Sequence, residues 1–454
     1  MSKLGVLLMV VIACAPAPSA EFSGSFIEPS EFDTEYPEPP AVPDGPLDPS
    51  VDNELGSLIV SIRQGGFETE ALDGIVAGGD ARVAWFLADL MRFFQGAGPG
   101  SQLARAFESL TGASVSADPR SSFVPAVNHL IAWDLPAWDG YDQRKREIYT
   151  IVEPRWDAFF EENVSIDWRL VTWGGVLIDD RPLGNIDPCP RGCIPALDDP
   201  PTVPADEGDW YPDNEIIFGV VVDDEALALP KNQMEVHEMV NLTLGGSRLG
   251  IPYCTLCGSA QAYLTESVPE EFDTVVLRTS GLLSRSNKVM YDLETMSVFD
   301  TFTGEALSGP LGEAQVVLEQ VSVVASTWGE WKKSHPESRI IAQDGGIGRT
   351  YRLDPLGDRD TDGPIFPVGP VDPRLPVQAQ VVGVIATDGV PLAFPVLETR
   401  SALLDGERVG YENLEVSLDG DGLKVVGPDG PVTAHQAFWF AWSQFHPSTL
   451  VWSP

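Results

Sequence analysis

From about residue 165 onward, the chain is a series of short β-branched runs separated by Gly, Pro and Asp. Examples are VTWGGVLI, EIIFGVVV, TVVLRTS, QVVGVIA and LEVSLDG. Runs of this length are typical of strands, and the pattern lacks the long amphipathic segments that alternating βαβ units require. We therefore expect residues 166–454 to form a mainly β domain.

A different pattern, with helical spacing, occupies residues 51–165. Asp80 is expected to cap a helix, Ser101 to open another with Gly112 as its end, and residues 141–152 (YDQRKREIYTIV) to form a third. The apolar and aromatic stripes of these segments are interpreted as core. The expected fold is α+β overall, with a small helical domain preceding the β-rich domain.

Two segments of the β-rich region resemble each other. IFGVV leads through two Asp residues to ALP at 228–230, and VGVI leads through Asp-Gly to AFP at 393–395. Each reads as a hairpin with an acidic turn and a terminal Pro. We expect residues 216–230 and 381–395 to be equivalent hairpins of a duplicated module.

Length and charge limit the functions that the chain can have. A chain of 454 residues is long enough for two or three domains. Its formal net charge of −40 and its lack of a basic patch exclude nucleic-acid binding and attraction to anionic lipid headgroups. No dinucleotide, P-loop, nucleophile-elbow or HExxH motif is present, so catalytic residues, substrate and protein partner are left open.

The N-terminus reads as a targeting segment. Leu4 to Ala13 is an apolar run that is too short to span a bilayer but suits a signal peptide of residues 1–13. The run ends in VIAC, which is similar to a bacterial lipobox and predicts lipidation of Cys14; the alternative is cleavage near Ala20. Residues 14–50 are expected to form an acidic, Pro-rich, solvated tether. We expect a cell-envelope protein held outside the cytoplasm, with the lipid as its only membrane contact.

Two of the five cysteines, Cys254 and Cys257, lie close together in IPYCTLCGSAQAYL. His237 precedes them, and the Gly245-Gly246 turn would let it fold back over Cys254. Imidazole nitrogen and thiolate sulfur suit zinc or copper, so the three side chains are expected to converge on one ion. Met290 is the preferred fourth ligand for copper, and Glu238 is interpreted as a residue outside the ligand set or at the surface.

Other functions of these cysteines stay open. Cys254 and Cys257 also suit a redox dithiol, although the βαβ context usual for such a motif is missing. Alternatively, they are structural staples in a non-catalytic binding module of the envelope. Cys189 and Cys193, in DPCPRGCIPAL, are candidates for a local disulfide or for cross-links to the other pair.

Several motifs carry a family resemblance. They are VHEMVNLTLGG…IPYCTLCGSAQAY, SGLLSRSNKVMYDLETMSVFDTFTGEALSGPL, STWGEWKKSHPES, RTYRLDP and AFWFAWSQFHPST. In this order, over roughly residues 190–454, they resemble the mostly bacterial family named domain of unknown function 3179. Thr255, Leu242 and Leu229 depart from that pattern, and the candidate ligands do not. The resemblance implies one domain of conserved order, and the family name carries no known activity. Arg285, Asn287, Tyr291 and Asp292 lie in the matched stretch as candidates for a pocket, although turn or surface positions are favoured for each.

Overall fold

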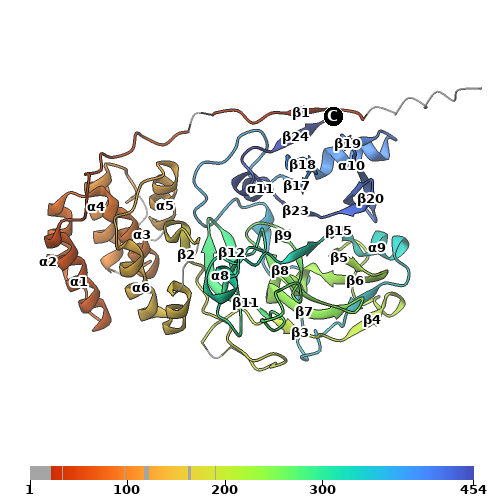
Figure 1. Ribbon diagram of the computed structural model, residues 1–454, viewed down its shortest axis with the longest axis horizontal. Helices are drawn as coiled ribbons and strands as arrows, with labels where there is room; N and C mark the ends of the chain where they lie inside the picture. Colours follow the sequence, from red (N-terminus) through yellow and green to blue (C-terminus); the bar gives the residue numbers. More distant parts are fainter. Residues whose placement is uncertain (1–21, 33, 97, 117–121, 162–164, 190) are drawn as a thin grey trace, which may run out of the picture.

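The computed structural model describes residues 22–32, 34–96, 98–116, 122–161, 165–189 and 191–454. The helices of the N-terminal part gather at one side and the β-sheets, with shorter helices among them, at the other, as Figure 1 shows. A helical N-terminal part is therefore followed by a β-rich part, which confirms the predicted fold class. In the described residues, no helix is both long and apolar enough to cross a membrane.

The helical part consists of six α-helices that share one buried core. Their bounds are α1 (Pro49–Arg63), α2 (Thr69–Gly78), α3 (Ala84–Phe93), α4 (Gly98–Thr111), α5 (Phe123–Ala132) and α6 (Tyr141–Val152). The bounds predicted for α6 are confirmed. Asp80 caps a 3₁₀ turn directly before α3, where its Oδ1 accepts from Arg82 N at 3.0 Å. The expected start at Ser101 is wrong, because α4 begins three residues earlier, with Pro99 in its first turn.

A buried ion pair joins the helices to the β-rich part. Lys145 Nζ lies 2.8 Å from Asp89 Oδ1 and donates to the main-chain oxygen of Val171 at 2.6 Å. The hydroxyls of Tyr141 and Tyr149 both donate to the Asp89 carboxylate. Val171 opens β2 (Val171–Trp173), which pairs with β11 (Leu277–Ser284). The neighbouring strands are β12 (Asn287–Asp292) and β13 (Val298–Asp300). This sheet shares its core with the helices.

The β-rich part contains two five-stranded sheets of the same topology. The first runs β15-β5-β6-β16-β4 and the second β23-β17-β18-β24-β1. In the first sheet, the β5–β6 hairpin lies between antiparallel β15 and parallel β16, which come later in the chain and are joined by a helix. In the second, the β17–β18 hairpin lies in the same way between antiparallel β23 and parallel β24. The first module comprises β4 (Thr202–Pro204), β5 (Ile216–Val222), β6 (Glu225–Pro230), α7 (Lys231–His237), β15 (Val323–Thr327), α9 (Trp328–Ser334) and β16 (Arg339–Ile341). The second comprises β17 (Gln380–Ile385), β18 (Pro391–Pro395), α10 (Val396–Leu404), β23 (Ala434–Phe438), α11 (Trp439–Phe445) and β24 (Leu450–Ser453), with β1 (Ser25–Ile27).

Matching side chains fix the two modules in the same way. Gly219 lies under the indole of Trp331, and Gly383 lies under that of Trp442. Each indole Nε1 donates to a hydroxyl seven residues later, at 2.9 Å in the first module and 3.0 Å in the second. The duplicated hairpin is confirmed, and the repeat extends well beyond it.

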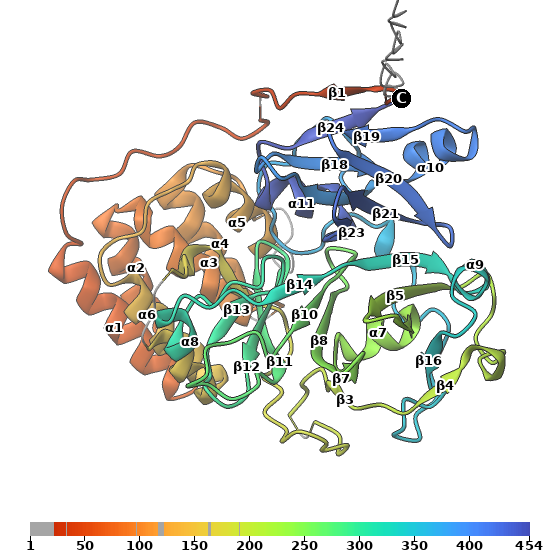
Figure 2. The same cartoon turned by 45° about the vertical axis from the view of Figure 1, so that its right-hand side comes forward.

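The N-terminal segment supplies the last strand of the second module. β1 pairs with β24 in the position that β4 takes beside β16. Trp452 Nε1 donates to Ser23 O at 3.1 Å, and further along Trp133 Nε1 donates to Pro37 O at 2.6 Å. Figure 2 shows this segment running from the β24 edge to the helices. Part of the sequence expected to be a solvated tether is thus bound to the fold, because it completes a sheet edge.

Each module carries an insertion between the helix that follows its hairpin and its next strand, that is, between α7 and β15 in the first module and between α10 and β23 in the second. The second holds a four-stranded sheet of β19 (Val409–Tyr411), β20 (Leu414–Asp419), β21 (Gly422–Gly427) and β22 (Gly430–Val432). The first is longer and includes the β11–β13 strands and α8 (Gly309–Glu313). Its other strands are β7 (Met239–Leu244), β8 (Ser247–Cys254), β9 (Ser259–Ala260), β10 (Ala262–Leu264) and β14 (Glu319–Val321), joined by β3 (Leu197–Asp198). The remaining short helices are 3₁₀ turns at Ala81–Val83, Pro154–Phe160, Trp168–Leu170, Ala205–Glu207 and Asp358–Asp360.

Candidate functional site

Cys254 and Cys257 lie at the two ends of a tight turn that follows β8. Cys257 N donates to Cys254 O at 3.2 Å, and Gly258 continues the reversal at a φ of +59°. Both cysteines are free and buried. The chain then returns as β9, in which Ser259 pairs with Cys254. Because cross-strand partners share a face, the Cys254 and Ser259 side chains lie on the same side of this hairpin.

The turn between β11 and β12 faces the two sulfurs. Arg285 and Ser286 form this turn at φ values of +46° and +68°, a left-handed conformation that is uncommon for residues with a side chain. Ser286 O lies 3.7 Å from Cys254 Sγ and 3.4 Å from Cys257 Sγ. Asn287 Oδ1 lies 3.7 Å from Cys257 Sγ. Ser286 O therefore contacts both buried sulfurs, and Asn287 Oδ1 contacts Cys257 Sγ.

The insertion of each module contacts the later helix of the other module at an equivalent position. In the insertion of the second module, Asp421 Oδ1, in the β20–β21 turn, accepts from Thr327 N at the start of α9 in the first module. The equivalent group at the start of α11, Phe438 N, donates to Cys257 O at 2.8 Å. The start of α9 is thus bonded by the β20–β21 turn, and the start of α11 is bonded in the same way by the cysteine turn.

The two thiols differ in acidity. Burial raises the cost of ionising either one. For Cys254, the hydrogen bond from Cys257 and two main-chain N–H groups outweigh this cost and lower the thiol pKa. For Cys257, burial and the neighbouring Cys254 sulfur raise the pKa well above its usual value. Cys254 is therefore the thiol that ionises first.

A lysine and a glutamate lie beside Cys254. Lys288 Nζ donates to the main-chain oxygen of Glu238 and lies 3.5 Å from its carboxylate. Thr255 Oγ1 donates to Glu238 Oε1 at 3.0 Å. Burial lowers the Lys288 pKa, and the negative charges of Glu238 and Cys254 oppose that effect. Glu238, at the C-terminal end of α7, thus anchors Lys288 near the sulfur.

A pocket of about 230 Å³ opens onto this group. Of the described residues, Cys254 belongs to its wall and Cys257 does not. Glu238, Lys288 and Arg359 add charge to a mainly apolar lining. The apolar members of the wall are Val176, Ile194, Leu256, Leu282, Leu283, Leu356, Ile365 and Phe366.

The DUF3179 family model, described as Protein of unknown function, matches residues 191–429, more than half of the chain. The chain belongs to this family. The resemblance seen in the sequence is thereby confirmed. Comparison with curated proteins and with solved structures gives no match.

His237 does not lie with the two cysteines. Among the described residues, no group of three metal-binding side chains contains His237 with Cys254 and Cys257. Its Nδ1 donates to Pro195 O at 2.7 Å, and its Nε2 accepts from Tyr351 at 2.8 Å. Burial lowers the His237 pKa to about 4, so the ring is neutral at pH 7. The three-ligand prediction is wrong, because α7 ends with this ring turned toward the loop that contains Pro195.

Met290 is also not a ligand. It packs in an apolar cluster with Met239 and Leu277, whereas the cysteines belong to another cluster. Met290 follows Asn287 by three residues along β12, which places their Cα atoms roughly 10 Å apart. The sequence missed Asn287 as a contact of Cys257 and Lys288 as a neighbour of Cys254. The available signal was the polar run SNK directly before the apolar residues Val289 and Met290 of β12.

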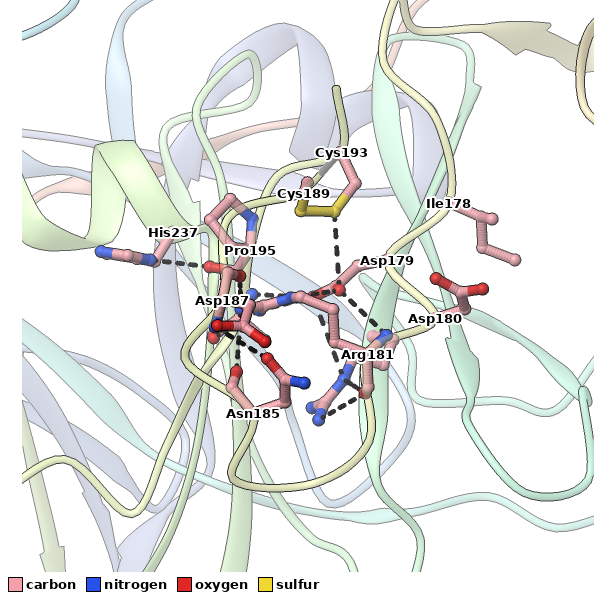
Figure 3. The surroundings of a disulfide bond; sticks show 12 residues. Ile178, Asp179, Asp180, Arg181, Asn185, Asp187, Cys189, Cys193, Pro195 and His237 are labelled. Atoms are coloured by element: carbon pink, nitrogen blue, oxygen red, sulfur yellow. Dashed lines mark hydrogen bonds and ion pairs between the residues drawn. A yellow bond between two sulfur atoms is a disulfide. The ribbon is translucent and has the colours of Figure 1, made fainter. Parts of the chain in front are cut away.

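The second cysteine pair of this DUF3179 chain forms a local disulfide between Cys189 and Cys193. Figure 3 shows Asp179 beside it, with Oδ1 at 3.5 Å from Cys193 Sγ. These three residues form a compact group. However, the Asp179 carboxylate accepts from Arg181 Nε at 2.7 Å and from Ala196 N at 2.9 Å. The two sulfurs are thus bonded to each other, and the carboxylate is hydrogen-bonded to Arg181 and Ala196. We interpret this group as one that holds the loop in place.

Proposed function

We propose that Cys254 and Cys257 form a thiol–disulfide exchange centre. The observation that carries the proposal is their asymmetry: both cysteines are buried, but Cys254 lines the wall of the pocket and Cys257 does not. Exchange requires one sulfur that a substrate can reach and a second that can attack the first. The tight turn between the two cysteines supplies that pair.

The reaction would proceed in two displacements. The Cys254 thiolate attacks one sulfur of a substrate disulfide, which forms a mixed disulfide and releases the other sulfur as a thiolate. Cys257 then gives its proton to the released thiolate and attacks Cys254 Sγ. This forms the Cys254–Cys257 disulfide and releases the second substrate thiolate. Two electrons pass from the protein dithiol to the substrate disulfide, and the reverse sequence oxidises a substrate dithiol.

The surroundings support this chemistry. The Glu238 carboxylate disfavours a Cys254 thiolate, whereas the Lys288 main-chain N–H and the nearby Lys288 ammonium group favour it. The apolar wall suits a small apolar thiol or disulfide. The Cys189–Cys193 disulfide agrees with an oxidising compartment, in which such exchange has substrates.

Trapping of a mixed disulfide tests the proposal. In a background with Cys189 and Cys193 changed to Ser, Cys257→Ser is expected to accumulate a mixed disulfide with a chromophoric aromatic disulfide, because no second thiol resolves it. Cys254→Ser is expected to react at least ten times more slowly, because Cys257 does not line the pocket and its thiol pKa is raised. Mass spectrometry and release of the aromatic thiol measure both. Equal trapping by the two variants, or none by either, would contradict the proposal and favour structural cysteines.

We also propose that the protein is an exported lipoprotein. Residues 1–21, with the signal segment and Cys14, lie outside the described residues. The apolar run ending in VIAC and the disulfide support export.

Cys14→Ser is expected to move the protein from the membrane fraction to the soluble fraction, because the lipid is proposed to be its only anchor. Fractionation and mass spectrometry of the N-terminus measure this. A wild-type N-terminus that carries no lipid would exclude the anchor.

A further inference from the structure

The geometry points to a zinc site made by the reduced Cys254 and Cys257 together with two oxygens of the β11–β12 turn. The oxygens are the Ser286 main-chain oxygen and Asn287 Oδ1. This inference goes beyond the proposed function: it uses the same reduced thiols but needs no exchange reaction. It also replaces the ligand set expected from the sequence, because neither His237 nor Met290 takes part.

The distances between donor atoms fit a tetrahedral ion. Zinc bonds to thiolate sulfur at about 2.3 Å and to oxygen at about 2.0–2.2 Å, so sulfur and oxygen ligands of one tetrahedral ion lie roughly 3.6 Å apart. The structure has Ser286 O at 3.7 and 3.4 Å from the two sulfurs. Asn287 Oδ1 lies at 3.7 Å from Cys257 Sγ. All three distances match ligands that share an ion.

The β11–β12 turn gives an independent indication. Asn287 is buried, and its Oδ1, the amide atom that can bind a cation, faces Cys257 Sγ. The Ser286 hydroxyl is also buried and unpartnered among the described residues. Ser286 has a φ of +68°, which costs on the order of 1 kcal/mol for a residue other than glycine. Positive φ at both Arg285 and Ser286 is the usual geometry of a two-residue hairpin turn, and here it directs Ser286 O toward both thiols.

Charge selects zinc over monovalent copper. Two thiolates and one Zn²⁺ are neutral together, which suits cysteines that are no more than 1% exposed. Cu(I) would leave one net negative charge in the same place, and it would bind through the sulfurs without needing the two oxygens. The neighbouring Lys288 and Glu238 offset each other. Because a Cys254–Cys257 disulfide uses both sulfurs, the ion is expected only in the reduced protein.

Zinc titration of the reduced protein tests the site. With Cys189 and Cys193 changed to Ser, we expect one zinc per chain in competition with a chromophoric chelator. Asn287→Ala should weaken zinc binding at least tenfold, whereas Asn287→Asp, which keeps an oxygen, should retain it. Cu(I) binding should be the same in Asn287→Ala and in the parent. The matched control is Asn232→Ala, which removes a buried asparagine on α7 and should leave zinc binding unchanged.

Two results would overturn the zinc site: no zinc uptake by the reduced parent, or equal zinc affinity in the parent and Asn287→Ala. A second measurement needs no variant at Asn287. The reduced parent loaded with Co²⁺ should show thiolate-to-cobalt charge transfer and tetrahedral ligand-field bands, and their absence would also overturn the proposal. The exchange assay, run with excess chelator, is independent of these results, so failure of one proposal does not imply failure of the other.

Discussion

Asp89→Asn is expected to destabilise the protein by about 3–5 kcal/mol, because it leaves the charge of Lys145 buried without its partner. Lys145 is fully buried and Asp89 is 3% exposed. The same carboxylate accepts from the Tyr141 and Tyr149 hydroxyls, so two further hydrogen bonds weaken. Since Lys145 also holds Val171 O, the loss should loosen the contact between the helices and β2. Denaturant unfolding followed by tryptophan fluorescence measures the change.

The control for Asp89→Asn is a surface pair. Glu330 and Lys333 form an ion pair on α9, in which Lys333 is well exposed. Solvent screens such a pair, and Glu330→Gln should leave the unfolding midpoint nearly unchanged. If the two variants have similar midpoints, the buried network does not hold the helices to the sheet.

Gly383→Ala and Gly219→Ala are each expected to destabilise the protein by about 3 kcal/mol. A Cβ at Gly383 would lie 2.1 Å from the Trp442 ring, and one at Gly219 would lie 2.3 Å from the Trp331 ring. Neither indole can retreat easily, because its Nε1 is held by a hydroxyl. Thermal unfolding of both variants measures the equivalence of the two modules.

Gly98→Ala is the matched control for these two variants. Gly98 opens α4, and a Cβ added there would meet no packed neighbour within 4 Å among the described residues. A change of no more than about 0.5 kcal/mol is therefore expected. If only one of Gly219→Ala and Gly383→Ala destabilises the protein, the two modules share a topology but the glycine–tryptophan contact does not contribute equally to their stability.

Local pattern was sufficient for several features of the fold. The α6 bounds followed from helical spacing, and the two hairpins followed from matching runs with an acidic turn and a terminal Pro. These features depend on neighbours in the chain, where side-chain period and turn residues select the backbone conformation. Family membership was also readable, because it depends on the order of motifs along the sequence.

The candidate site was only partly readable. The sequence placed Cys254 and Cys257 in one tight turn, because three residues of separation leave little freedom. It did not place His237, whose ring bonds to Pro195 and Tyr351, residues far from it along the chain. It also interpreted Asn287 as a turn residue, without indicating that the turn lies against the cysteines.

The sequence by itself determined the types of element, the repeated hairpins and the family. Only the tertiary structure decided that β1 completes the second module, that His237 stays away from the sulfurs, and that Ser286 and Asn287 approach them. The physical reason is that element type follows from local periodicity, whereas each of these contacts joins segments separated by many residues. Such contacts form only when the packing of whole sheets brings the segments together.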